Sequence, residues 1–408
     1  VDIAVIDDDR KETEEFATQM TIAGNSGLNF VNVSAIPEYD IIIDGIFGTG
    51  LSRNVEGIYA DVIDLINCSN NVVVSVGIDS EAGAVFSKAV KADATVTFGY
   101  NKVGNMIYPG KELSGEVTVA DIGFCPEAIK TLNPCMYFTE DDLRKIPDRK
   151  AYSNKGTYGK ILVIAGSRDM SGAAYLSGAS AYRTGAGLVE ILTYESNTDI
   201  IKKLLPEAIV TGYNEDNYCC MLEKSLKKAT CVILGPGLSK DITAHNITEE
   251  VLKRCEVPLI IDADALNIIA EDISLLKSYS HVAIITPHIG EFMRLTGLTK
   301  EELLKDSVAA AKCFAQEFNV ILVMKNAVTV VAEPCENGRA YINSSGTGAM
   351  SKAGMGDVLT GVIAGMLSLR IEPFSAACMG VYLHGIAGEI AEEEQGSHSV
   401  MAGDVVNI

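Results

Sequence analysis

The chain has 408 residues, of which 48% are hydrophobic and 21% are charged, a composition typical of globular rather than disordered proteins. Its 54 acidic residues outnumber the 33 Lys and Arg and give a net charge of −21, which disfavours nucleic acid and anionic membranes as partners. No run approaches the roughly 18 apolar residues of a membrane helix, and the first residues lack the basic stretch of a signal peptide. The ten Cys are scattered along the chain. We therefore expect a cytoplasmic protein with reduced thiols.

The first third of the chain contains short apolar, β-branched runs at 39–44, 71–76 and 94–98. Such runs are typical of strands buried on both faces, as in parallel sheets. Between the first two, residues 57–67 place their Ile, Val and Leu side chains on one helical face. This alternation predicts an α/β domain over residues 1–125.

A domain boundary is expected over residues 126–150. Pro126, Pro134 and Pro147 lie there together with the charged stretch 140–150, and no strong strand pattern interrupts them. We therefore predict a linker at 126–150 and a second domain over 151–408.

The second domain repeats the alternation of strand and helix more often. Helical stretches include 301–318 and 357–369. The predicted strands are 160–165, 188–192, 231–234, 258–262, 281–286, 320–324 and 329–332. The fold class predicted for the chain is therefore α/β, with two doubly wound domains.

The strongest local motif is the glycine-rich stretch 343–364. Gly346, Gly348, Gly354 and Gly356 precede an apolar helix that begins near Asp357. Glycines allow the backbone to approach a ligand, and the first N–H groups of a helix attract anions. Asp357 could simply cap the helix, but a cap does not require four glycines. An anion site beside a carboxylate suits phosphoryl chemistry with Asp357 as general base.

Further candidate residues follow predicted strands, where parallel sheets bind ligands. The stretch 235–238 (GPGL) is either a ligand loop or an ordinary turn. Asp262 and Asp264 could hold Mg²⁺ through water or cap the next helix. His288 could face the same pocket or be structural. Between two strands, Lys325 and Thr329 could contact a nucleotide or lie in a plain turn.

In their order along the chain, these motifs resemble the nucleotide-dependent NAD(P)H-hydrate dehydratases. The resemblance rests on 155–189 (KGTYGKILVIAGSRDMSGAAYLSGASAYRTGAGLV) followed by GPGL, IDADALN, TPHIGE and GMGDVLTGVIAGML, and it covers residues 151–408. It implies a ribokinase-like fold and a homo-oligomer, a tetramer or larger. The implied reaction uses ADP or ATP with Mg²⁺, with ADP the more expected donor. It phosphorylates the C6 hydroxyl of the S form of hydrated NADH or NADPH and then eliminates phosphate.

The same resemblance implies roles for individual residues. Asp357 is the implied base. The implied substrate contacts are Ala173, Gly237, His288 and Asp357. The implied nucleotide contacts are Lys325, Asn326, Ala327, Val328, Thr329, Gly354 and Gly356. The family usually has Lys-Gly where this chain has Lys325-Asn326, a departure that bears on nucleotide affinity. Because Asn tolerates left-handed backbone angles, we expect the loop to persist.

The first half resembles the NAD(P)H-hydrate epimerase domain, a Rossmann-like unit, here lacking its N-terminal part. The resemblance rests on 44–51 (DGIFGTGL) and 89–122. It implies K⁺ binding by Asp44 and Ser80. The implied substrate loop comprises Gly48, Thr49, Gly50, Leu51, Ser52, Arg53 and Asn54.

One position departs from the epimerase pattern. The family's Asp-Ile-Pro-Ser-Gly segment reads Gly77-Ile78-Asp79-Ser80-Glu81 in this chain. Gly77 has no side chain with which to exchange a proton, and Asp79 lies two residues further on. We therefore predict that epimerase activity is weak or lost.

Two alternatives remain open at this point. A ribokinase-like small-molecule kinase, such as a vitamin kinase, shares the Gly-Xaa-Gly-Asp turn before a helix. A nucleotide-binding sensor without turnover fits the first half best, where Gly77 replaces an acid. The joint presence of GPGL, IDADALN and PHIGE favours the dehydratase.

Overall fold

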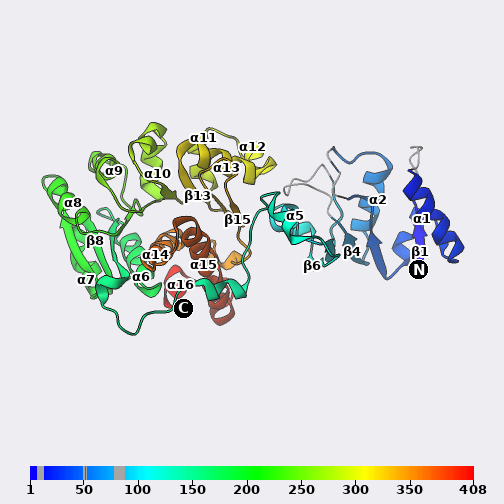
Figure 1. Ribbon diagram of the computed structural model, residues 1–408, viewed down its shortest axis with the longest axis horizontal. Coiled ribbons are helices and arrows are strands. Elements are labelled where there is room, and N and C mark those ends of the chain that lie inside the picture. The colour runs from blue at the N-terminus through cyan, green and yellow to red at the C-terminus, as the bar shows by residue number, and fades with distance from the viewer. Residues whose placement is uncertain (7–12, 49–50, 52, 78–87) are drawn as a thin grey trace. The chain divides into compact units, whose positions relative to one another are not determined.

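The computed structural model describes residues 1–6, 13–48, 51, 53–77 and 88–408. The chain separates into two compact units, residues 1–131 and 132–408 (Figure 1). None of the helices within the described ranges combines the length and apolar character needed to cross a membrane.

The second unit is built on one nine-stranded sheet, and its fold is α/β as predicted. The strand order is β15-β14-β13-β12-β11-β10-β7-β8-β9. The seven strands β7 to β13 pair in parallel, whereas β14 and β15 are antiparallel to their neighbours. Their bounds are β7 Lys160–Ile164, β8 Leu188–Tyr194, β9 Ile209–Tyr213, β10 Cys231–Leu234, β11 Leu259–Ile261, β12 Ala283–Ile285, β13 Val320–Met324, β14 Val330–Ala332 and β15 Ala340–Ile342.

Helices cover both faces of this sheet (Figure 1). Residues 161–164 of β7 are all fully buried, although successive side chains of a strand point to opposite faces. Ile161 and Val163 belong to the core shared with α14 and α15, whereas Leu162 and Ile164 face the other layer. The helices are α6 Ser171–Arg183, α7 Thr198–Leu204, α8 Tyr218–Leu226, α9 Ile242–Arg254, α10 Ala263–Ile269, α11 Ile289–Thr296, α12 Lys300–Lys305, α13 Ser307–Phe318, α14 Met355–Ser368, α15 Pro373–Gln395 and α16 Ala402–Asn407.

The contact between α14 and α6 depends on glycine. A Cβ atom on Gly361 would lie 2.0 Å from Oγ of Ser180, and one on Gly365 would lie 2.4 Å from Cβ of Thr184. Only glycine therefore allows the two helix backbones to approach this closely. This packing holds the start of α14 over the sheet.

Two details of the second unit differ from the sequence-based expectation. The stretch 301–318 was expected to be one helix, but it is divided between α12 and α13 at Asp306, whose Oδ1 accepts a hydrogen bond from the Ala309 N–H at 2.8 Å. Strands β9 and β15 were not anticipated. Strand β15 has only three residues, and β9 contains Gly212, which weakens its strand pattern.

Residues 132–150, predicted as part of a linker, pack against the second unit. Met136 pairs with Tyr341 of β15, and the ring of Phe138 lies 4.7 Å from the ring of Tyr341. Leu143 packs on the same core. Residues 126–130, by contrast, form α5 (Pro126–Lys130) within the first unit. The functional limits of the two domains stay a prediction.

The first unit contains a four-stranded parallel sheet in the order β3-β4-β5-β6. A separate pair of parallel strands, β1 and β2, lies in the same unit. The elements are β1 Asp2–Ala4, α1 Glu14–Asn25, β2 Asn29–Val31, β3 Ile41–Asp44, α2 Ile58–Asn67, β4 Val72–Val76, β5 Ala94–Phe98, α3 Val103–Met106, α4 Gly110–Leu113 and β6 Glu116–Ala120. The strands expected at 39–44, 71–76 and 94–98 are present, whereas β1, α1, β2 and β6 were not anticipated.

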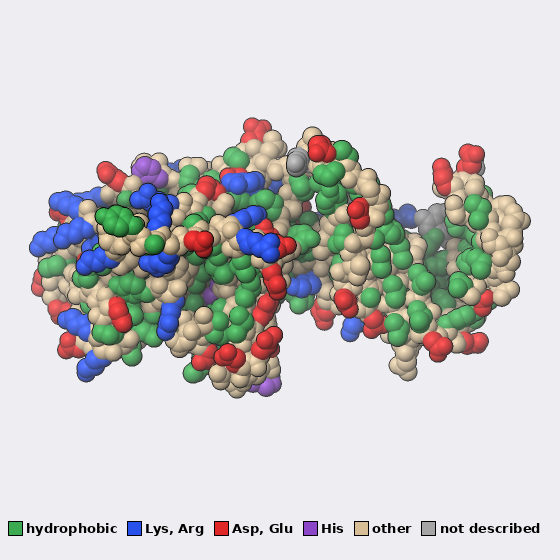
Figure 2. Space-filling view, turned by 60° about the horizontal axis from the view of Figure 1, so that its bottom comes forward, with side chains coloured by type: hydrophobic (Ala, Val, Ile, Leu, Met, Phe, Trp, Pro, Cys, Tyr) green, Lys and Arg blue, Asp and Glu red, His purple; other side chains and the backbone are tan. Residues whose placement is uncertain are grey.

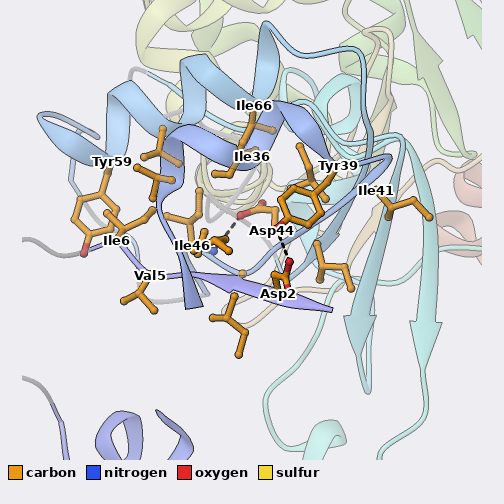
Figure 3. A pocket seen from close by; sticks show the side chains of 18 of the residues that line it. Asp2, Val5, Ile6, Ile36, Tyr39, Ile41, Asp44, Ile46, Tyr59 and Ile66 are labelled. Carbon is orange, nitrogen blue, oxygen red and sulfur yellow. Dashed lines mark hydrogen bonds between the residues drawn. The ribbon is translucent and has the colours of Figure 1, made fainter. Parts of the chain in front are cut away.

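A hollow of about 600 Å³ lies between β1 and β3 (Figure 3). Most of its lining is aliphatic, and the hydroxyl of Tyr39 donates a hydrogen bond to Oδ2 of Asp2 at 2.6 Å across it. Asp44, at the end of β3, points into this hollow (Figure 3).

Candidate functional site

The candidate site of the second unit lies where the parallel strands end. The chain passes from β7 through β8 and β9 on one side and then returns to β10 on the other side of β7, which makes the β7–β10 edge a topological switch point. Two hydrogen bonds join the loops that follow these strands: Gly166 N–H donates to the Pro236 carbonyl at 2.9 Å, and Ser167 N–H donates to the Gly237 carbonyl at 2.6 Å. These bonds hold the two loops together at the switch point, where parallel sheets commonly bind ligands.

A buried ion pair lies at this edge. Nζ of Lys325, the residue after β13, is 2.7 Å from Oδ1 of Asp262, the residue after β11, and their side chains are 19% and 2% exposed. The backbone N–H of Lys325 donates to the Pro287 carbonyl at 2.8 Å, which fixes the start of the hairpin. Asp262 occupies the N-cap position of α10 without a side-chain capping bond, so its carboxylate serves the ion pair rather than the helix end.

The first turn of α14 approaches this pair through glycines. Gly354 is the N-cap with φ of 90°, a left-handed angle, and a side chain there would meet Leu176 at 2.7 Å. A Cβ atom on Gly356 would lie 3.1 Å from Nζ of Lys325 and 3.4 Å from Oδ2 of Asp262. The helix N-terminus, with its unpaired N–H groups, is thus held beside an ammonium group, an arrangement that suits a phosphate.

Asp357 lies in this first turn with its backbone carbonyl doubly anchored. Oγ of Ser177 and Oγ1 of Thr360 donate to that carbonyl at 3.0 and 2.7 Å. The pKa of the Asp357 carboxyl is raised to about 7, first by burial and then by the negative charges of Asp262 and Asp264, against the lowering effect of Lys325. A carboxyl group with a pKa near neutrality is suited to accept a proton from a hydroxyl group.

Gly237 and Ala173 meet on the neighbouring side of the edge. Gly237 has φ of 58°, and a Cβ atom there would lie 3.0 Å from Cβ of Ala173 and 2.9 Å from Cβ of Met170. In the same loop, Ser239 N–H donates to Oδ2 of Asp264 at 2.9 Å. The second acid of the IDADALN motif therefore orders the GPGL loop.

The environment of His288 fits both interpretations that the sequence left open, a structural role and a position facing the pocket. Its Nδ1 accepts hydrogen bonds from Gly290 N–H at 3.0 Å and Glu291 N–H at 3.3 Å, so it caps α11. Its side chain is nevertheless 54% exposed, with Nε2 3.5 Å from Oε1 of Glu291. Burial and the nearby Lys325 lower the pKa of His288, which favours a neutral ring that can contact a ligand through Nε2.

A cavity of about 420 Å³ lies on the other side of Lys325. Five groups of residues line it: the β13–β14 hairpin, the loop after β15, the turn before α14, the first turns of α14, and α15. Lys325, Asn326, Ala327, Thr329 and Gly356, all expected to contact nucleotide, are among the lining residues. Two others expected there do not line the cavity: Val328 is buried at 6% exposure, and Gly354 packs against Leu176.

Asn326 does not take the left-handed conformation considered from the sequence. It is exposed and is absent from the described non-glycine residues with positive φ. The hairpin therefore does not need a glycine at this position.

Helix α15 provides site residues that the sequence-based analysis missed. Two acids of α15 hold the glycine-rich loop: Glu389 accepts a hydrogen bond from Gly346 N–H at 2.6 Å, and Glu392 accepts one from the Thr347 hydroxyl. One helical turn earlier, buried His384 lines the cavity. Spacings of three and four residues, together with Gly385 and Gly388 within the helix, were the available signal.

In the first unit, the carboxylate of Asp44 is buried. Its Oδ1 accepts a hydrogen bond from Ile46 N–H at 3.0 Å, and its Oδ2 accepts one from the Ser75 hydroxyl at 2.8 Å. Of the expected substrate loop, Gly48, Arg53 and Asn54 are exposed, and Leu51 is half-buried. Thr49, Gly50, Ser52 and Ser80 lie outside the described residues.

Within the described ranges, no three His, Cys, Asp or Glu side chains gather into a metal-binding group. The negative charges of Asp262 and Asp264 both raise the pKa of Asp357, whereas Lys325 lowers it. Acidic charge at this edge is thus only partly balanced by Lys325.

Comparison with known protein families matches both units. The model of NAD(P)H-hydrate dehydratase matches residues 161–408, and that of the YjeF-related protein N-terminus matches residues 1–104. The chain is 36% identical over 403 residues to a bifunctional NAD(P)H-hydrate repair enzyme of Moorella thermoacetica, covering 95% of this chain and 75% of that protein.

Two relatives correspond to the second unit. The ADP-dependent (S)-NAD(P)H-hydrate dehydratase of Bacillus subtilis is 36% identical over 277 residues, covering 67% of this chain and 95% of that protein. A crystal structure of the ADP/ATP-dependent NAD(P)H-hydrate dehydratase of Bacillus subtilis, co-crystallized with ATP/Mg²⁺, matches with a TM-score of 0.57 and 34% identity, covering 66% of this chain and 95% of that one.

Proposed function

The chain belongs to the family of bifunctional NAD(P)H-hydrate repair enzymes, and from this premise we propose how its residues dehydrate hydrated NADH and NADPH with ADP or ATP. The observation that carries the proposal is Asp357, a carboxyl group with a pKa of about 7 at the N-terminus of α14, close to the ion pair of Lys325 and Asp262. The site thus combines a base with a binding place for phosphate.

The proposed reaction begins with proton transfer to Asp357 from the C6 hydroxyl of the S hydrate. The freed oxygen attacks the terminal phosphorus of the nucleotide, and the bond from that phosphorus to the bridging oxygen breaks. The C6–O bond then breaks with loss of phosphate and of a proton from C5, which restores the ring double bond. In the overall reaction, the hydrate and the nucleotide are converted to NAD(P)H, phosphate and a nucleotide with one phosphate fewer.

The remaining residues bind and orient the two reactants. The hydrated ring is proposed to contact Ala173, Gly237 and His288, which lie at the carboxyl edge of the sheet. The nucleotide is proposed to occupy the cavity lined by Lys325, Asn326, Ala327, Thr329 and Gly356. Asp357 lies in the first turn of α14, directly after Gly356. We propose that its carboxyl group faces the ring on one side and the nucleotide on the other.

Mg²⁺ fits this site as a partner of the nucleotide phosphates. Mg²⁺ usually binds one or two carboxylates together with substrate phosphates and water, so a cage of protein ligands is not required. Asp262, whose Oδ2 is not engaged by Lys325, and Asp264 are the proposed carboxylates. When bound, the ion neutralises charge on the transferred phosphoryl group.

The dehydratase is distinguished from a kinase by its product. The solved relative at 34% identity is a dehydratase, which does not favour the kinase alternative. Purified protein should convert the S hydrate to NADH, with ADP proposed as the preferred donor over ATP. A phosphorylated hydrate that accumulates without formation of NADH would instead support a kinase.

The first unit is proposed to have the epimerase-type fold with weak or no activity. Asp44 would bind K⁺, since its buried carboxylate has no cationic side chain as a partner among the described residues, and buried charges require compensation. The thermal stability of the wild type should then depend on K⁺, and Asp44→Asn should lose that dependence.

We also propose a homo-oligomer, a tetramer or larger, and a cytoplasmic location. Measurement of the molecular mass by light scattering tests the oligomeric state.

A further inference from the structure

A further hollow of the second unit lies beside the candidate substrate site. Its volume is about 480 Å³, and it is lined by Lys240, Asn267, Ala270, Glu271 and Arg294. Lys240 follows the GPGL loop, Asn267 belongs to α10, and Arg294 belongs to α11. The hollow therefore lies among the elements that follow β10, β11 and β12.

Both cations of this hollow are available for a ligand. Neither Lys240 nor Arg294 forms an ion pair with a carboxylate within the described ranges. Arg294 donates through Nε to Oδ1 of Asn267 at 3.1 Å, which orients the guanidinium group, and among the described residues its two terminal nitrogens donate no hydrogen bond to a side chain or carbonyl. The one lining carboxylate, Glu271, lies 3.2 Å from Nε2 of His245 and thus already has a partner.

The chain has a net charge of −21, so its overall field disfavours anions. The face of the second unit drawn in Figure 2 shows that basic side chains nevertheless gather in groups between acidic ones. A local positive site can therefore attract an anion even though the overall field does not.

The position of the hollow connects it to the reaction centre. Asn267 lies five residues beyond Asp262, about 7 Å along a helix of 1.5 Å rise per residue. Arg294 is close enough to His288 to lower its pKa, and Lys240 lies three residues beyond Gly237. A molecule whose reacting end contacts Gly237 and His288 would extend toward Lys240 and Arg294.

We propose that Lys240 and Arg294 bind a phosphate group of the dinucleotide substrate, outside the reacting ring, with Asn267 positioning the guanidinium. This inference rests on the proposed function, whose substrates carry a diphosphate in both forms and a 2′-phosphate only in the NADPH form. A guanidinium group suits phosphate because it presents paired N–H donors. The two residues would then contribute to substrate affinity and not to the chemical step.

The test uses the full chain with the double substitution Lys240→Ala/Arg294→Ala. Its KM for hydrated substrate should rise at least about tenfold, the scale of one or two charge-assisted hydrogen bonds, with kcat changed by less than about twofold. A diphosphate contact predicts an equal rise for both hydrates, whereas a 2′-phosphate contact predicts a rise for hydrated NADPH alone. Lys240→Arg/Arg294→Lys, which keeps the charges, should recover part of the affinity.

A matched control removes two other exposed lysines, Lys202 and Lys203 of α7, and should leave both KM values unchanged. Calorimetric binding of NADH and NADPH provides a second readout that does not depend on turnover. Unchanged KM and unchanged Kd in Lys240→Ala/Arg294→Ala would overturn the proposal. Absence of turnover in the unsubstituted protein would instead refute the proposed function, and the binding data would still decide the role of the hollow.

Discussion

Nζ of Lys325 lies 2.7 Å from Oδ1 of Asp262, and these two residues join the ends of strands β13 and β11 beneath the first turn of α14. Lys325 also lines the cavity that we propose for the nucleotide, and it lowers the pKa of Asp357 against the opposing effects of burial and Asp262. The Lys325 ammonium group therefore both pairs with a buried carboxylate and influences the pKa of Asp357.

Replacing Lys325 with Met should destabilise the second unit. The substitution leaves the Asp262 carboxylate buried without its partner, which costs about 3–5 kcal/mol in comparable pairs. Urea denaturation monitored by circular dichroism measures the loss. Lys325→Met/Asp262→Leu removes both charges and should recover most of it; an equally unstable double variant would show that packing, not charge, explains the effect.

Asp357→Asn should make the protein more stable than wild type, and increasingly so as pH rises. The folded-state pKa of about 7 lies above the ordinary value of 3.8, so the contribution of this carboxyl to stability is complete below pH 3.8 and is lost as pH rises through 7. Between pH 5.5 and 8.5 the advantage of the variant should grow by about 1–2 kcal/mol. Denaturation at both pH values measures it, with Asp216→Asn, an exposed loop residue, as control. A constant difference would contradict the raised pKa.

Asn326→Gly should alter nucleotide affinity more than turnover. Asn326 lines the cavity proposed for the nucleotide but needs no left-handed φ, so glycine removes only a side chain from the cavity wall. We expect the KM for ADP or ATP to change severalfold, with kcat within about twofold, in steady-state assays. A large fall in kcat with unchanged KM would place Asn326 in the chemical step instead.

The first unit should equilibrate the R and S hydrates slowly or not at all. Gly77 has φ of 110°, a conformation that L side chains rarely adopt, so the backbone as well as the side chain departs from a site that presents an aspartate. Chromatography of purified R hydrate incubated with the protein would follow S hydrate formation. A rate comparable to that of other epimerases would refute the predicted loss.

Periodicity and strand ends accounted for most of the second unit. Runs such as 231–234 and 320–324 were recognisable because every residue in them is apolar, and in the structure every one of these residues is buried. The roles of Asp262 and Asp264 were not resolved from sequence, since they depend on Lys325 and Ser239, which lie 63 and 25 residues away along the chain. The contributions of Glu389 and Glu392 were missed for the same reason: their partners, Gly346 and Thr347, lie more than forty residues away.

The first unit was predicted less completely. Strand β1 has only three residues, and α1 buries none of the residues that the structure describes, so neither has a strong apolar pattern. The resemblance of 44–51 to an epimerase loop directed attention to Asp44, whose burial and hydrogen bonds are now visible, but Thr49, Gly50, Ser52 and Ser80 lie outside the described residues.

The most direct test of the account compares the decay of hydrated NADH by wild type and by Asp357→Ala, with ADP or ATP and Mg²⁺ present. If Asp357 accepts the hydroxyl proton, the variant should lose activity at least about a hundredfold while still binding nucleotide, since removal of a general base has effects of that size. A folded Asp357→Ala protein that repairs the hydrate at close to the wild-type rate would contradict the central claim.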